Sequence, residues 1–323
     1  MAKTLDNVAK EVAVAEIKQY GEKLILPEGM GLDVAIDLLE RRREYLEEET
    51  EFTEHYDVMP FDGANALAEV LVKKFGWAPQ TSTPGFFGKN PPRMLSVKVG
   101  FGVNKSVPWG RFSLPNISGH VECGVSRKNG RFCFSLEASV LRKDEAAVRS
   151  LCNDIHEFLK EGSIYKGKAV KIRFLDDDGD ALSMPEVDFL DVSKIDPNSL
   201  IYAKPVQDAV ETNLFTPINR IKDCIANNIP VKRGVLLGGV FGTGKTMAAT
   251  VASRLAVDNG LTYLYVPRAD ELSMAIEFAK QYQSPACVIF CEDIDRVTSG
   301  ERSVEMDDIL NIIDGIDTKD ARI

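Results

Sequence analysis

The residues of this chain best suited to chemistry lie at positions 239–246 and read G-x-x-x-x-G-K-T. They are Gly239, Val240, Phe241, Gly242, Thr243, Gly244, Lys245 and Thr246. Glycines let backbone N–H groups crowd around an anion, and Lys245 supplies a positive charge for phosphates. The Thr246 hydroxyl is a ligand for Mg²⁺, and a helix that follows such a loop adds the positive end of its dipole. We therefore expect these residues to bind the phosphates of a nucleoside triphosphate, with ATP and Mg²⁺ as the cofactors.

Two neighbouring carboxylates, Glu292 and Asp293, form the second candidate group. They follow the apolar run 286–291, which is typical of a buried strand, so they are expected at the carboxyl end of that strand. Carboxylates there hold Mg²⁺ through its waters and orient the water that attacks the γ-phosphate. Acidic strand ends are common, so this interpretation depends on the phosphate-binding motif that precedes them.

Apolar runs predict the elements that must position these groups. The run Val235–Leu237 predicts the strand that enters the loop, and a helix is expected directly after it. Residues 262–266 predict a further strand, and residues 273–282 predict one helix before the strand that ends at Glu292.

The first 204 residues carry no motif with chemistry in it. Residues 1–79 are predicted to be a helical N-terminal region and residues 80–180 a small α+β domain. Asn129 and Gly130, between two alternating runs, predict a β-hairpin, and a helix over 144–160 and a strand over 169–175 follow. Residues 181–204 contain scattered prolines and predict a linker before the module at 205–323.

Three segments together resemble the AAA branch of the AAA+ ATPases. They are GVLLGGVFGTGKT, VIFCEDID and ILNIIDGID, and the resemblance extends from about residue 205 to the end. It implies an α/β P-loop NTPase fold, in which helices flank a parallel sheet. It also implies ATP hydrolysis by a homo-oligomeric ring, usually a hexamer, that remodels other macromolecules. By the same resemblance, Glu292 corresponds to the magnesium carboxylate and Asp293 to the water-activating one, with Lys245 as the third catalytic residue.

The chain departs from this family in three ways. Its Glu-Asp order reverses the usual Asp-Glu, although a similar order occurs in the AAA translocase that moves the folded Rieske protein across the mitochondrial inner membrane. The short stretch 267–285 lacks the aromatic-hydrophobic-glycine loop with which unfoldases grip an extended polypeptide. Arg296 and Arg302 stand too early in the motif order to be the family's arginine finger. The sensor and lid are not found before Ile323, so we expect the front part of a longer protein.

Composition limits the partners. The chain of 323 residues has 39 basic and 49 acidic residues, a net charge of −10, which is a poor footprint for binding duplex DNA. No apolar stretch of membrane-spanning length and no signal-peptide core are visible, so a cytoplasmic location without membrane association is expected. None of the six cysteines forms a C-x-x-C pair.

The acidic run at 176–180 invites a calcium-loop interpretation, which its spacing does not support. If Asp176 is loop position one, positions six and twelve should be Gly and Glu, but they are Ala181 and Val187. An acidic surface turn is the preferred interpretation.

Three functions remain open at this point. The leading one is a ring ATPase that remodels or moves a protein partner, with residues 1–200 recognising the substrate or an adaptor. The alternatives are an AAA+ ATPase that acts on nucleic acid and an ATP-binding assembly switch with little hydrolysis. The sequence does not identify the adenine contacts, but the segment Ile201-Tyr202-Ala203 is the expected place for them.

Overall fold

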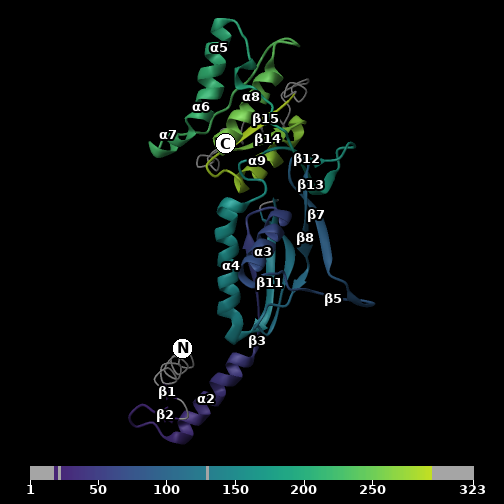
Figure 1. The fold of residues 1–323 in the computed structure, drawn as a ribbon. Coiled ribbons are helices and arrows are strands. Elements are labelled where there is room, and N and C mark those ends of the chain that lie inside the picture. Colours follow the sequence, from purple (N-terminus) through teal and green to yellow (C-terminus); the bar gives the residue numbers. More distant parts are fainter. Residues whose placement is uncertain (1–17, 21–22, 129–130, 293–323) are drawn as a thin grey trace, which may run out of the picture.

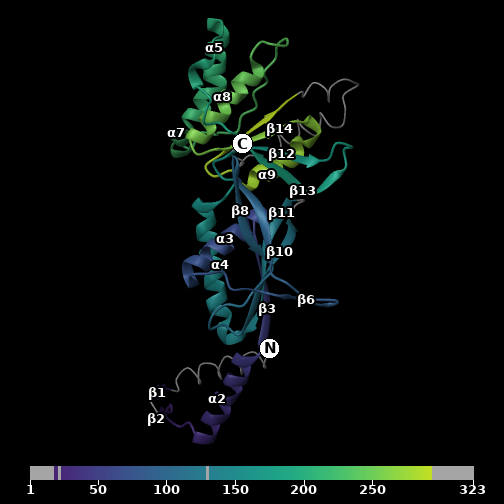
Figure 2. The same cartoon turned by 45° about the vertical axis from the view of Figure 1, so that its right-hand side comes forward.

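The computed structural model describes residues 18–20, 23–128 and 131–292. Within these ranges the molecule is elongated, with α2 (Leu32–Glu47) at one end and α5 (Lys204–Val210) at the other (Figure 1). Between these two helices lie two sheets, one nearer each end of the molecule, and the turned view in Figure 2 shows the same arrangement.

The first sheet is antiparallel and has five strands in the order β3-β11-β10-β9-β4. Their bounds are β3 Glu49–Tyr56, β4 Gln80–Thr81, β9 Arg111–Phe112, β10 Gly119–Lys128 and β11 Arg131–Leu141. The predicted hairpin is present, because β10 and β11 pair continuously from Gly119↔Val140 to Lys128↔Arg131. Its turn residues 129–130 lie outside the described residues.

Two helices, α3 (Pro60–Phe75) and α4 (Arg142–Gly162), cover one face of this sheet (Figure 1). Helix α3 is buried along most of its length because it packs on both β11 and β8 (Val103–Trp109). Gly63 permits this approach, since a Cβ atom there would lie 2.1 Å from the ring of Phe134 on β11.

Three short antiparallel pairs complete this half of the chain. They are β1–β2 (Lys18–Tyr20, Lys23–Ile25), β5–β6 (Thr83–Gly85, Gly88–Asn90) and β7–β8, in which β7 spans Arg93–Gly100. Residues 49–56 were expected to be helical and are instead strand β3. Their alternation of inward Phe52 and Tyr56 with exposed polar residues has the period of two that defines a strand.

The second sheet overturns the predicted parallel P-loop fold. It has four strands in the order β13-β12-β14-β15, with bounds β12 Ala169–Leu175, β13 Ala181–Phe189, β14 Thr262–Val266 and β15 Cys287–Cys291. Only β12–β14 and β14–β15 pair in parallel, whereas β12–β13 is antiparallel. Most sheet pairs of the described chain are therefore antiparallel, and the one mixed sheet has few parallel strands.

The strand expected at Val235–Leu237 is also absent. Residues 229–240 have no regular secondary structure, and Leu236 is 81% exposed. A short apolar run becomes a strand only where another strand pairs with its backbone, and none of the described strands does so here. The sheet instead extends at its other edge through β12 and β13, which come from ranges that had been predicted to be the small domain and the linker.

Strand β14 of the second sheet is buried on both faces. On β14, Tyr263 packs with α8 (Lys245–Asp258), whereas Leu264 and Val266 pack with α9 (Leu272–Gln281). The α9 side is continuous with the core of the first sheet, so a single hydrophobic cluster joins Leu67 of α3 to Phe278 of α9. The domain boundaries remain a prediction, but the proposed boundary at residue 180 divides strands of one sheet.

The remaining helices are short and precede the phosphate-binding motif. Helix α5 continues through a π-helical turn (Glu211–Phe215) into α6 (Thr216–Asn219) and α7 (Ile221–Ala226). Of the helices that the structure describes, none is both long and apolar enough to cross a membrane.

Candidate functional site

The phosphate-binding motif lies in a turn that leads directly into α8. The helix begins at Lys245, and Gly244 before it has a φ of +87°, while Gly242 has a φ of +78°. Both values lie in the left-handed region that side chains other than glycine rarely occupy, so these glycines meet a backbone requirement. The turn therefore places its backbone at the N-terminus of a helix, where an anion is stabilised.

Lys245 is held by the loop itself. Its Nζ donates to the carbonyl oxygens of Gly239 at 2.7 Å and Val240 at 3.1 Å, and Thr243 Oγ1 donates to Val240 at 2.8 Å. Among the described residues, no carboxylate forms an ion pair with Lys245. Its positive charge is therefore available to an anion at the loop.

Thr246 and Glu292 are brought together although 46 positions separate them. Thr246 Oγ1 donates to Glu292 Oε1 at 3.2 Å. The contact follows from the sheet, because β15 ends immediately before Glu292 while α8 packs on the same sheet. Two residues predicted as magnesium ligands thus share a hydrogen bond.

A tyrosine that the sequence did not single out completes this contact. Tyr265 lies on β14 beside β15, and its hydroxyl donates to Glu292 Oε2 at 2.8 Å. Both oxygens of the Glu292 carboxylate are thereby oriented, one by α8 and one by β14. The signal that could have revealed this residue is its place near the carboxyl end of the strand parallel to β15.

Tyr202 connects the segment before α5 to the loop. Its hydroxyl donates to the carbonyl of Gly244 at 2.7 Å, and its side chain packs closely on position 244, where a Cβ would lie 3.0 Å from the Tyr202 ring. Residues 201–203 were expected to lie near the adenine, and Tyr202 does lie against the phosphate-binding turn.

The structure describes only some of the other residues that the sequence predicted for the site. Val240 and Phe241 are 77% and 100% exposed, and the Phe241 ring centre lies 5.9 Å from Lys245 Nζ. Asp293 lies outside the described residues, as do Arg296 and Arg302.

The donor set at Thr246 and Glu292 fits a magnesium ion. A hydroxyl and a carboxylate are the hard oxygen ligands that Mg²⁺ prefers, and this ion is usually held by one or two protein groups together with waters and phosphates. The described residues contain no cluster of three or more His, Cys, Asp or Glu side chains that could hold a metal. A site completed by phosphate oxygens does not require such a cluster.

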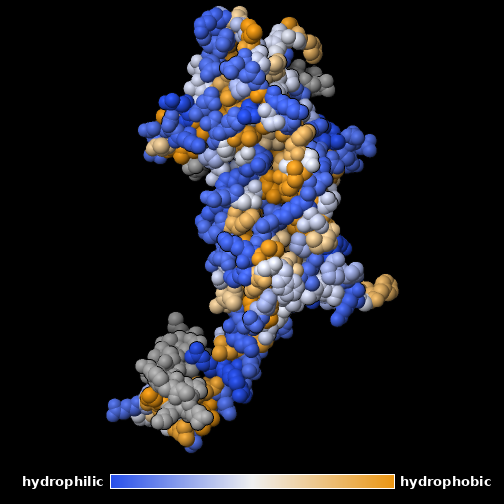
Figure 3. All heavy atoms as spheres, viewed as in Figure 1, coloured by the Kyte–Doolittle hydropathy of each residue, from blue (hydrophilic) through white to orange (hydrophobic). Residues whose placement is uncertain are grey.

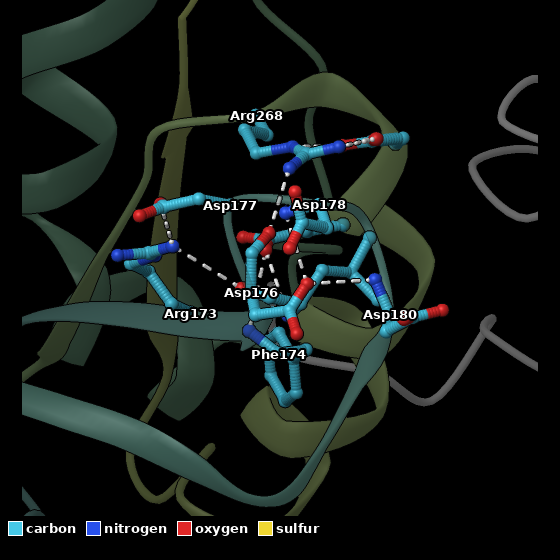
Figure 4. A network of polar contacts seen from close by, with 10 residues as sticks. Arg173, Phe174, Asp176, Asp177, Asp178, Asp180 and Arg268 are labelled. Carbon is cyan, nitrogen blue, oxygen red and sulfur yellow. Dashed lines mark hydrogen bonds and ion pairs between the residues drawn. The ribbon is translucent and has the colours of Figure 1, made fainter.

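The acidic turn at 176–180 uses its carboxylates within the protein (Figure 4). The Asp176 carboxylate accepts from the backbone N–H groups of Asp178 and Asp180, and Asp177 pairs with Arg173 at 2.7 Å. Arg268, which follows β14, donates to the carbonyl oxygen of Asp176. These contacts describe a turn that links β12 to β13, as the preferred interpretation expected.

Comparison with known proteins adds no assignment. A scan of protein-family models finds none that matches this chain, and a search of curated proteins finds no match either. The interpretation of the site rests on its residues and their geometry.

Proposed function

We propose that this chain binds ATP with Mg²⁺ at residues 239–246 and hydrolyses it. The observation that carries the proposal is the hydrogen bond between Thr246 and Glu292. It places the hydroxyl that follows the glycine-rich turn beside a carboxylate at a strand end, and these are the two oxygen ligands that a magnesium site next to the phosphates needs. A positive helix end, a lysine that no described carboxylate neutralises and a carboxylate for a hard cation converge at this one place.

Each residue has a defined task in this proposal. The backbone N–H groups of 242–246 and the Lys245 ammonium bind the phosphate oxygens, and bound ATP replaces the loop carbonyls as partners of Nζ. Thr246 and Glu292 would hold Mg²⁺, directly or through its waters, and the ion would supply positive charge beside the phosphates. Asp293 takes a proton from the attacking water, as the resemblance to the AAA ATPases implies.

We further propose that several copies form a homo-oligomeric ring, hexameric by the same resemblance, in the cytoplasm. Residues 1–200 then recognise a protein substrate or adaptor, and hydrolysis remodels or moves that partner. Support comes from the resemblance and from the acidic net charge of −10, which disfavours nucleic acid as the partner.

The decisive experiment is an equilibrium titration with Mg-ATP, measured by calorimetry on the wild type and two variants. Lys245→Ala should weaken binding about 10- to 100-fold, because a charged hydrogen bond to the phosphates is lost. The control Lys222→Ala, an exposed lysine of α7, should bind like the wild type. Equal affinity in all three proteins would refute the assignment of the loop.

Hydrolysis is tested separately, as ATPase rate against protein concentration. A rate per chain that rises steeply with concentration and vanishes in Lys245→Ala supports a ring ATPase. Tight ATP binding without turnover at any concentration would favour the assembly switch. Stimulation by DNA and not by protein would favour the nucleic-acid alternative.

A further inference from the structure

A second concave site lies where the two sheets meet, and it shares no residue with the phosphate-binding loop. It is an open cavity of about 360 Å³, bounded by the β10–β11 hairpin, β12, β13 and α9. Figure 3 shows hydrophobic side chains gathered on this face, between α9 and β13 as they lie in Figure 1. The volume falls in the range of sites that bind small organic molecules.

The walls of this cavity are mainly apolar and aromatic. The side chains that determine its character are Phe132, Phe174, Leu182, Pro185, Met274 and Phe278. They come from four different elements, so the cavity forms only when these elements pack together, and no single segment of the chain forms it. Such walls favour an apolar ligand body over a sugar or a nucleotide.

Arg131 adds a guanidinium to the wall of the same cavity. Its side chain is only 9% exposed and forms ion pairs with two carboxylates, with Glu277 Oε2 at 3.9 Å from Nε and Asp57 Oδ2 at 3.4 Å from a terminal nitrogen. Its Nε–H has no hydrogen-bond acceptor among the described residues, but the Nε atom is itself buried. Arg131 therefore contributes positive charge to the cavity wall, and a ligand in the cavity does not reach its Nε.

Arg127 adds a positive charge that the described protein does not neutralise. Its guanidinium lies 4.4 Å from the centre of the Phe132 ring and lines the cavity, and none of the described carboxylates pairs with it. The acidic residue in the lining, Glu277, already contacts Lys280 of the same helix. The charge balance of the cavity therefore favours a ligand with one negative group.

From these features we infer that the cavity binds a small carboxylate with an apolar alkyl or aryl body. The body lies against the phenylalanine, leucine and methionine walls, and the carboxylate pairs with Arg127, near the positive charge of Arg131. The inference is independent of the proposed ATPase function, because no residue of the loop takes part.

Calorimetric titration with octanoate and 1-octanol tests this inference, because the two probes share an apolar chain and differ in the head group. Octanoate should bind the wild type with one site per chain and at least about tenfold more tightly than octanol. Arg127→Gln should weaken octanoate about tenfold and leave octanol unchanged. Lys128→Gln, the adjacent exposed charge outside the cavity lining, should change neither.

Filling the cavity provides the second test. Leu182→Trp should abolish binding of both probes while circular dichroism confirms the fold, and Met274→Trp serves if the first variant does not fold. Equal binding of octanoate and octanol to the wild type, or no saturable binding of octanoate, would overturn the inference. Unchanged octanoate binding in Arg127→Gln would overturn it as well.

Discussion

The five-stranded sheet and the phosphate-binding turn differ in how much of their structure is buried. The sheet pairs β10 with β11 over ten consecutive residue pairs and buries Phe134 and Leu136 completely. The turn at 239–246 follows residues 229–238, which have no regular structure, and leaves Phe241 fully exposed. The sheet and its helices have a dense core without a chemical motif, whereas the turn combines Lys245, Thr246 and Glu292 with little packing of its own.

This contrast shows how the molecule separates stability from binding. The groups that would contact phosphate are held by hydrogen bonds at the start of α8 and at the end of β15, and α8 packs in the hydrophobic cluster on its side of the second sheet. A loop supported in this way can rearrange around a ligand at low cost, because few buried contacts have to break. Substitutions in the sheet should therefore change folding, and substitutions at the turn should change binding.

The largest difference is expected from removing one phenylalanine ring from each region. Phe134→Ala deletes a fully buried side chain beside Tyr56 and should lower the free energy of unfolding by about 3–5 kcal/mol. Phe241→Ala deletes a fully exposed one and should change it by less than about 0.5 kcal/mol. Urea denaturation measures both, and similar losses in the two variants would contradict the contrast.

The next effect concerns Asp62, a fully buried carboxyl of α3. Burial raises its pKa from 3.8 to about 6, although Ile164 N–H and Ser163 Oγ donate to it. The folded protein binds this proton more tightly than the unfolded chain does. Protonated Asp62 therefore makes its full contribution to the free energy of unfolding below pH 3.8, and this contribution is lost as the pH rises through about 6. A shift of this size corresponds to a loss on the order of 3 kcal/mol.

Asp62→Asn should remove that dependence, since an amide does not ionise. Unfolding free energies at intervals from pH 4 to pH 7 should fall less steeply in the variant than in the wild type. Identical slopes for the two proteins would show that Asp62 does not carry the effect.

At the turn, Glu292→Gln should act on magnesium and not on folding. The neutral amide can still meet Thr246 but loses the charge that attracts the cation, so the Mg²⁺ concentration for half-maximal ATP binding should rise about 10- to 100-fold. Glu211→Gln, an exposed residue before the loop, is the control and should leave the Mg²⁺ dependence unchanged.

Asp293→Asn should retain ATP binding and lose hydrolysis about 100-fold or more, because the base that activates water is removed. If Asp293→Asn still hydrolyses ATP while Glu292→Gln does not, the roles assigned to the two carboxylates are reversed.

The smallest effect is expected from Tyr202→Phe. The change removes one hydroxyl, which donates to the Gly244 carbonyl at 2.7 Å, and keeps the ring that packs on the turn. We expect ATP affinity to fall by a factor of about 2–10, the equivalent of roughly 0.5–1.5 kcal/mol for one hydrogen bond. A loss as large as that of Lys245→Ala would mean that Tyr202 contacts the nucleotide itself.

Local pattern was sufficient for most individual elements. The strands at 169–175 and 262–266, the helix over 144–160 and the hairpin around residues 129–130 are present with small differences at their ends. The glycines before Lys245 also specified a turn into a helix, and α8 begins at that lysine. These features depend on periodicity and backbone freedom, which the neighbouring residues alone determine.

Pairing between distant segments was decided only by the tertiary structure. An apolar run predicts a strand but not its partner, so β12 could be predicted as a strand without showing that it lies beside β14. For the same reason Val235–Leu237 resembles a strand but pairs with none of the described strands, and those strands do not form the parallel sheet expected around it. The contacts of Glu292 with Thr246 and Tyr265, and the cavity beside Arg131, depend on the same long-range packing. The chain by itself specified which residues could do chemistry, and the packing of its two sheets decided which of them meet.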